Sequence, residues 1–399
     1  MKKYRNIIGG VLCVITIVAG IILWNMTNKN LTDEWIYYSF LEGKGDLDLS
    51  GKERKSGLWR IQKESGKQEL IWDGSGEGSY VAFFVTEDNI YAQKLFEGIY
   101  RMDLDGSNLT PVYKGTVNAY QLRYQDDWLY FSNSLDKKEQ SYKGDSYLRL
   151  HTKTGELDSF LPDRCTITKT PYSSFVVDED SFYTITALDG QMGILHYNLN
   201  TKIQKQYSFS ELSLPDWKEK NEMSFELEDC GEYILLICLD YRASGHTMGI
   251  YAAKKGSAIS EKTVWKEVRF PDMLPGTAAP PHCLPAEGGY AIVNGERSGY
   301  IFHDNFAYYL NEDWKLCSRP LFGKPEEATV YEETSLAVDS EGRFRDMSCS
   351  LSFGKRNFYY RYYTKIDEEN AVNNAGNENY RPIPTEWRGY IGNIPCLQK

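Results

Sequence analysis

Short apolar runs separated by polar turns recur along most of the chain. In the stretch GIYRMDLDGSNLTPVYKG, residues 98–115, two runs in which apolar and polar residues largely alternate flank the turn DGSN at 105–108. Alternation with a period of two is typical of a β-strand that buries one face. Asp, Gly and Asn favour tight turns. The stretch therefore predicts a β-hairpin.

This hairpin has counterparts at spacings of 41 to 57 residues. They begin at residues 57, 98, 146, 193, 249, 306 and 357, and a further apolar run, usually led by an acidic turn, precedes each of them. A period of this length with three or four short strands is the signature of a propeller blade, whose sheet buries its faces only against neighbouring sheets. We predict an all-β fold, a seven-bladed β-propeller, with residues 98–115 as the outer half of one blade. Six or eight blades are the alternatives, because the last three repeats match weakly.

The first period has no apolar run between the N-terminal segment and Trp35 that could serve as its first strand. The segment TEWRGYIGN, residues 385–393, lies at the far end of the chain and has a strand-like pattern. We expect it to pair with the first blade and so to close the circle, because closure removes exposed sheet edges.

The N-terminal segment has a different pattern. Residues 7–24 contain no charge, and as a helix they would span about 27 Å, close to the hydrocarbon thickness of a bilayer. Lys2, Lys3 and Arg5 precede them, which places the N-terminus in the cytoplasm. A cleaved signal peptide would need small residues before a cut, and none lie at the polar edge of this segment.

These patterns predict the domain organisation. Residues 1–6 form a cytoplasmic tail, residues 7–24 one transmembrane signal-anchor helix in contact with the lipid bilayer, and residues 25–32 a linker. Residues 33–399 form the propeller domain, outside the cytoplasm at the cell membrane. A buried core helix over 7–24 is the alternative, and its place after a basic cluster at the terminus argues against it.

Composition and charge narrow the partners. Hydrophobic residues make up 41% and aromatic residues 14% of the chain, with 30 tyrosines, which suits half-buried sheets. The formal net charge is −11, and the first thirty residues hold basic but no acidic side chains. Because an acidic surface repels phosphate backbones, we expect no nucleic-acid partner.

No motif assigns a catalytic, cofactor-binding or metal-binding residue, and we expect no cofactor. The eight cysteines form no C-x-x-C, the five histidines have no metal-ligand spacing, and no G-x-S-x-G or P-loop occurs. Residues 46–57 resemble the front of a calcium loop but have Gly57 where a bidentate glutamate is needed. Cys230 and Cys238 either form a disulfide or lie in adjacent strands.

Paired carboxylates are frequent, as in Asp126-Asp127 and Glu228-Asp229. Acidic residues are common at hairpin tips, and we interpret these pairs as turn formers. A glycoside-cleaving propeller would instead project two carboxylates into its axial funnel.

The segments GIYRMDLDGSNLTPV, DWLYFSNS and EWIYYSF together resemble a bacterial family of unknown function. That family has a propeller akin to the YWTD propellers of lipoprotein receptors and to TolB-like repeats. The resemblance covers roughly residues 33–200. The YWTD motif itself is absent, since residues 37–40 read YYSF. The resemblance implies the propeller fold and an extracytoplasmic setting, and no catalytic residues.

Two functions are compatible with the sequence. The first is a membrane-tethered, non-catalytic binding or scaffold module for a protein, a peptide or a cell-wall glycan. Its binding surface would lie on the longer loops at residues 211–222, 271–285 and 367–380. The second is an extracytoplasmic hydrolase or lyase that acts on carbohydrate through carboxylates in the funnel.

Overall fold

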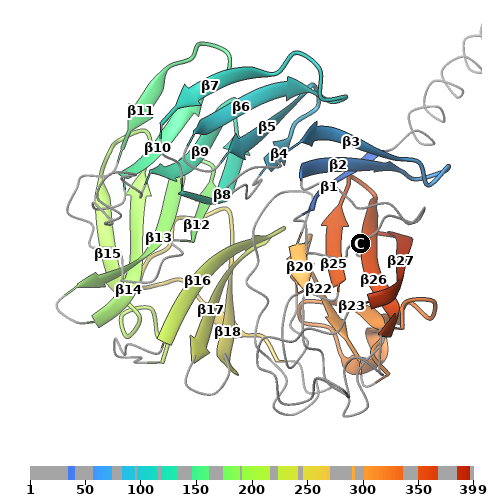
Figure 1. Cartoon of the computed structure of the whole chain (residues 1–399). Helices are drawn as coiled ribbons and strands as arrows, with labels where there is room; N and C mark the ends of the chain where they lie inside the picture. Colours follow the sequence, from blue (N-terminus) through green and yellow to red (C-terminus); the bar gives the residue numbers. More distant parts are fainter. Residues whose placement is uncertain are drawn as a thin grey trace, which may run out of the picture.

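The computed structural model describes most of the chain from Trp35 onward. The described residues are 35–40, 57–73, 83–94, 97–115, 118–133, 146–160, 174–188, 191–215, 223–240, 246–269, 290–292, 301–311, 313–335, 349–366 and 384–395. They form seven antiparallel sheets arranged as blades around a ring (Figure 1). Six of the sheets have four strands and the first has three. The chain is therefore an all-β, seven-bladed propeller, and the alternatives of six or eight blades are wrong.

The blades follow one another along the chain. Blade one consists of β1 (Trp35–Phe40), β2 (Gly57–Gln62) and β3 (Gln68–Asp73). Blade two consists of β4 (Phe83–Val85), β5 (Asn89–Lys94), β6 (Gly98–Asp103) and β7 (Thr110–Lys114). Blade three consists of β8 (Asn118–Gln125), β9 (Trp128–Asn133), β10 (Ser146–His151) and β11 (Leu157–Ser159). Blades four and five consist of β12 (Phe175–Asp178), β13 (Ser181–Leu188), β14 (Gln191–Asn198) and β15 (Gln204–Ser208); and β16 (Met223–Cys230), β17 (Tyr233–Asp240), β18 (His246–Lys254) and β19 (Trp265–Glu267).

The last two blades depart from this simple order. Blade six consists of β21 (Ile301–His303), β22 (Phe306–Leu310), β23 (Leu316–Pro320) and β24 (Thr329–Val330), and blade seven of β20 (Tyr290–Ile292), β25 (Cys349–Phe353), β26 (Asn357–Ile366) and β27 (Pro384–Asn393). Strand β20 thus precedes blade six in the sequence but pairs with β25 of blade seven.

The stretch that predicted the repeat has the expected place. Strands β6 and β7 are the two outer strands of blade two, and the Asp105–Asn108 segment connects them. Within that connection the Ser107 amide donates to the Asp105 carboxylate at 2.9 Å, and Gly106 has a φ of 86°. The hairpin is therefore the outer half of a blade, as the sequence predicted.

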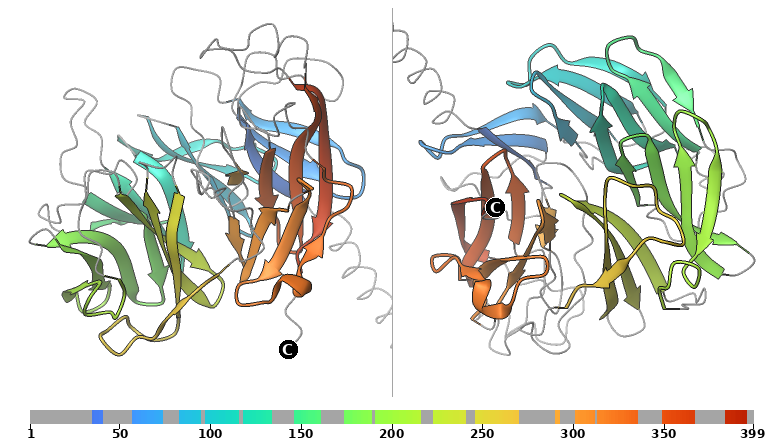
Figure 2. Two further views of the ribbon diagram at one scale, coloured as in Figure 1. Left: turned by 90° about the horizontal axis from the view of Figure 1, so that it is seen from below. Right: turned by 180° about the vertical axis from the view of Figure 1, so that it is seen from behind.

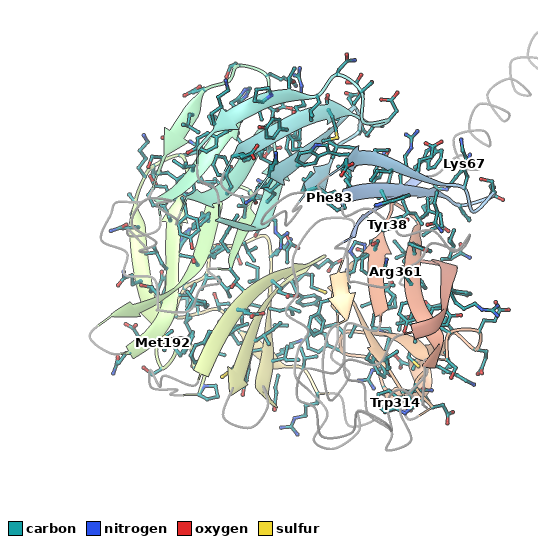
Figure 3. All side chains as sticks on the ribbon, in the orientation of Figure 1. Tyr38, Lys67, Phe83, Met192, Trp314 and Arg361 are labelled. Atoms are coloured by element: carbon teal, nitrogen blue, oxygen red, sulfur yellow. The ribbon has the colours of Figure 1, made fainter. Side chains whose placement is uncertain are left out.

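Seven clusters of buried side chains hold the ring together, one at each junction between neighbouring sheets. Each sheet thus buries one face against the blade before it and the other against the blade after it. At the closing junction Tyr38 of β1 packs against Tyr359 of β26, with ring centroids 5.2 Å apart. Both views of Figure 2 show the first blade beside the last, and Figure 3 labels Tyr38 at this boundary.

The predicted strand exchange at this closure is wrong. The segment at 385–393 belongs to β27, which pairs with β26 of its own blade and not with β1. The amide of Ile394, which follows β27, donates to the Arg356 carbonyl at 2.8 Å, as the Leu199 amide after β14 donates to the Asp180 carbonyl at 2.7 Å. The Ile394 bond ties the end of β27 to its own blade, where β27 is the edge strand of the order β20-β25-β26-β27. A long hairpin between consecutive strands replaces the pairing of the two chain ends, and side-chain packing alone closes the ring across the described residues.

The structure also tests the predictions for the cysteine pair and for the second acidic pair. Cys230 and Cys238 lie in the adjacent strands β16 and β17, are buried, and form no disulfide. Glu228 and Asp229 belong to β16, so the prediction that this pair forms a hairpin tip is wrong; the turn is at Gly231 and Glu232.

The predicted tail, transmembrane helix and linker (1–32) and the calcium-like loop up to residue 56 lie outside the described residues. In the part of the chain that is described, no helix is long and apolar enough to cross a membrane, and the short 3-10 helix η2 (Pro325–Glu327) is the helical element there.

Candidate functional site

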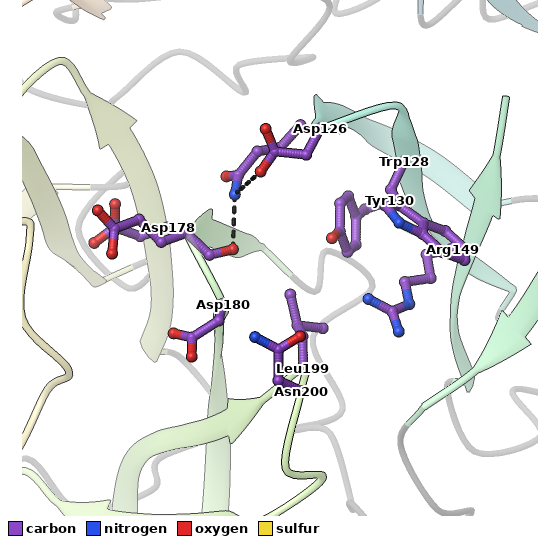
Figure 4. A pocket seen from close by; sticks show the side chains of 10 residues that line it. Asp126, Trp128, Tyr130, Arg149, Asp178, Asp180, Leu199 and Asn200 are labelled. Carbon is purple, nitrogen blue, oxygen red and sulfur yellow. Dashed lines mark hydrogen bonds between the residues drawn. The ribbon is translucent and has the colours of Figure 1, made fainter. Parts of the chain in front are cut away.

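A cleft of about 600 Å³ opens between blades three and four (Figure 4). Its lining comes from the end of β8, the β8–β9 turn, β9 and β10 on one side and from the end of β12 and the β12–β13 and β14–β15 turns on the other. The lining residues are Gln125, Asp126, Trp128, Tyr130, Arg149, Asp178, Glu179, Asp180, Leu199 and Asn200. The cleft therefore lies on the side of the ring where the short acidic turns are.

Tight turns put the acidic side chains at the cleft. Asp126 and Asp127 both have positive φ, 50° and 65°, as the two central residues of the hairpin turns that match strand twist do. Glu179 also has positive φ, 52°, in the equivalent turn of blade four. The side chain of Gln125 connects the two blades, since its Nε2 donates to the Glu179 carbonyl at 2.7 Å. The prediction that Asp126-Asp127 forms a turn is confirmed, but the same turn also lines a cavity.

Arg149 is held in place on the blade-three wall. Its guanidinium lies over the ring of Trp128, 4.3 Å from the centroid, and pairs with the Asp158 carboxylate at 2.9 Å. The side chain of Arg149 is 15% exposed. A planar cation fixed by an aromatic ring and a carboxylate loses little further freedom when it donates to a ligand.

Tyr130 lies opposite Arg149 in strand register and is 3% exposed. Burial raises the pKa of the Tyr130 phenol, and the nearby Arg149 cation acts in the opposite direction. The net shift is upward, so the phenol keeps its proton at neutral pH and can donate a hydrogen bond. In Figure 4 the Tyr130 hydroxyl and the Arg149 guanidinium both point toward the open space of the cleft.

The cleft carries an excess of negative charge. Asp126, Glu179 and Asp180 line it, while the charge of Arg149 is balanced by Asp158. Asp178 also belongs to the lining, but its carboxylate accepts from the Gly256 amide of blade five at 3.2 Å. Some of these carboxylates have local donors, such as the Asn198 amide at 2.8 Å from Asp180. The field favours a cationic group and disfavours phosphates or other anions.

Blade five carries an unusual carboxyl group. Glu226 is in β16, the strand of its blade nearest the ring centre, and burial raises its pKa to about 8, with the charge of Glu228 adding to the shift. A carboxyl that stays protonated near neutral pH can act as a general acid. Within the described ranges, no group of three or more His, Cys, Asp or Glu side chains is placed to hold a metal ion.

The loops predicted as binding surfaces contribute little to this cleft. Residues 216–222, 271–285 and 367–380 lie outside the described residues. In the described part, Leu212 and Leu214 are buried in the cluster between blades four and five, so residues 211–215 serve packing.

Trp128, Tyr130 and Arg149 were not predicted as site residues, although the repeat aligns the strands that carry them. The available signal was the arginine that recurs as the fourth residue of the repeats at 57, 98 and 146.

No protein-family model and no curated protein matches this sequence. Solved structures with a similar chain path include an oligogalacturonate lyase from Vibrio parahaemolyticus, with a TM-score of 0.44, 11% identity and coverage of 80% of this chain and 94% of that one. TolB from Acinetobacter baumannii has a TM-score of 0.35 at 11% identity, covering 78% and 75% of the two chains.

A nidogen/laminin complex has a TM-score of 0.38 at 8% identity, covering 75% and 94%. Likenesses this weak carry no argument about function. The fold assignment rests on the seven sheets and their seven junctions.

Proposed function

We propose that the protein is a non-catalytic binding module, held at the outer face of the cell membrane by residues 7–24. The observation that carries the proposal is the cleft between blades three and four, where acidic residues of two turns line the same cavity as an ordered tyrosine and arginine. Such a cavity, with ordered hydrogen-bond donors and a lining of mostly polar residues, suits recognition of a polar partner. The tether rests on the uncharged segment and its preceding basic cluster in the sequence.

A second candidate function is hydrolysis or lysis of a carbohydrate at the ring centre. It is favoured by Glu226, because a general acid for glycoside cleavage needs a raised pKa. Glu228 follows two residues later on the same strand and would be its partner carboxylate. This candidate ranks second because the cleft between blades three and four has no role in it.

Site-specific photo-crosslinking in intact cells separates the two. A benzophenone side chain would replace Asn200 at the cleft or, as a control, the exposed Lys324 in blade six. We expect protein or peptide adducts from position 200 and not from position 324. Equal capture at both positions, or no capture from a protein that degrades purified cell-wall glycan, would contradict the binding proposal.

A further inference from the structure

The junction of blades one and two is built from the same side chains as the junction of blades three and four. In blade one, Tyr37 is opposite Arg60, and Arg60 is opposite Glu69. Arg60 lies over Trp35, 4.2 Å from the ring centroid, and pairs with Glu69 at 2.6 Å. This is the arrangement that Trp128, Tyr130, Arg149 and Asp158 form in blade three, in the same strand register.

At the first junction the two donors share one acceptor. The Tyr37 hydroxyl donates to the carbonyl oxygen of Leu104 at 3.0 Å, and Arg60 Nη1 donates to the same oxygen at 2.8 Å. Leu104 is the first residue after β6 of the neighbouring blade. A main-chain carbonyl is thus the group that this pair of donors binds within the protein itself.

At the junction of blades three and four the donors are present without that acceptor. The residue equivalent to Leu104 is Leu199, the first after β14. Within the described part of the chain, neither Tyr130 nor Arg149 donates to the Leu199 carbonyl, and the hydrogen bond of Arg149 there goes to Asp158. Instead, Tyr130, Arg149 and Leu199 line the cleft (Figure 4).

We infer that the cleft binds an extended peptide of a partner protein whose main-chain carbonyl accepts hydrogen bonds from Tyr130 and Arg149 and whose neighbouring Lys or Arg side chain contacts Asp126 and Asp180. The inference rests on the proposed binding function and names its partner class. The ligand is a peptide because the oxygen that occupies the equivalent position at the first junction is a peptide carbonyl.

The charge of the cleft selects among acceptors. A carboxylate or phosphate would satisfy the two donors but would be repelled by the acidic side chains of the lining. A neutral carbonyl avoids that repulsion, and a basic side chain one residue away gains from it. A basic peptide has both groups, since its main-chain carbonyl is the neutral acceptor and its Lys or Arg side chain is the nearby cation.

The test measures fluorescence anisotropy of labelled, acetylated pentapeptides with the full-length protein in detergent. The central residue of the peptide is Lys, Arg, Ala or Glu. We expect the Lys and Arg peptides to bind most tightly and the Glu peptide most weakly. Tyr130→Phe should weaken binding about fivefold and Arg149→Gln at least about tenfold, as expected for loss of a neutral and a charged hydrogen bond. Tyr37→Phe, the matched change at the closed junction, should leave the affinity within about twofold, because Tyr37 is outside the cleft.

Three results would overturn the inference. Equal affinity of the Lys and Glu peptides would exclude the charge selection, and binding insensitive to Tyr130→Phe and Arg149→Gln would exclude this site while leaving a binding module elsewhere on the ring. Competition by chitosan oligosaccharide but by no peptide would replace the peptide with an amino sugar. The proposed binding function fails separately, if crosslinking at position 200 also captures nothing.

Discussion

Tyr37 and Tyr130 are equivalent residues that differ in what their hydroxyl groups do. Tyr37 donates to Leu104 across a blade junction at 3.0 Å, whereas Tyr130 faces a cleft. We predict that Tyr37→Phe lowers the free energy of unfolding by about 1 kcal/mol, the usual net contribution of such a bond. Tyr130→Phe should change it by less than about 0.5 kcal/mol. Thermal or urea unfolding of both variants checks this, and equal destabilisation would show that the two junctions do not differ as described.

Glu226 makes stability depend on pH in a defined direction. Its pKa is raised to about 8 in the folded protein, against 4.5 for the unperturbed group. Between these values the folded state holds the proton that the unfolded state has released, so the stabilisation is complete below pH 4.5 and is lost as the pH rises through 8. We predict that the wild-type protein loses roughly 2–4 kcal/mol relative to Glu226→Gln between pH 5 and pH 8. Parallel denaturant titrations at the two pH values measure the difference; a constant difference would mean that Glu226 is ionised throughout.

The sequence showed that the residues of the cleft belong to the repeat, but it did not show that they form a site. The repeat alignment placed Trp35 beside Trp128 and Arg60 beside Arg149, and the structure confirms both equivalences. Whether the next blade closes over such a pair or leaves it open depends on how two sheets pack. The spacing of residues along the sequence does not show how two sheets pack. Asp126-Asp127 was therefore predicted as a turn and not as part of a cleft.

At the scale of elements, Gly98 allows β6 and β7 of blade two to lie close together. Gly98 begins β6 with a φ of 135°, and a Cβ atom there would lie 2.0 Å from the Tyr113 carbonyl oxygen of β7. We predict that Gly98→Ala destabilises the protein by about 2–3 kcal/mol, because both the backbone conformation and the approach of β7 must change. Gly155→Ala is the control. Gly155 has a φ of 73°, but a Cβ atom added there would meet no other part of the protein within 4 Å, so the substitution should cost only about 1 kcal/mol. A comparison of unfolding midpoints decides; similar losses would remove the steric explanation.

Local elements were predictable and distant pairings were not. The hairpins at 98–115 and at 126–127 follow from alternation and turn residues, which act between neighbours in sequence. Strand β27 was assigned to the wrong blade because its pattern fits any open sheet edge. The pairing of β20 with β25 has no counterpart in the repeat at all, since one complete blade lies between them in the sequence.

The whole molecule is a ring because no sheet can bury both faces alone. Each of the seven junctions has its own cluster of buried side chains, including the junction of β1 with β26 that joins the first and last blades. In the described residues, β1 pairs with β2 and has no strand on its other side, so packing at Tyr38 and Tyr359 carries the closure. The period in the sequence predicted the number of blades, because seven repeats together indicate the ring even where the strands of a single repeat match weakly.

For the whole molecule, we propose that a partner is recognised between two blades and not over the ring centre. A crystal structure of the full-length protein with a Lys-centred pentapeptide tests it most directly. We predict peptide density between blades three and four, with a carbonyl oxygen about 3 Å from both the Tyr130 hydroxyl and the Arg149 guanidinium. A peptide bound along the central channel beside Glu226, with the cleft between blades three and four unchanged, would contradict it.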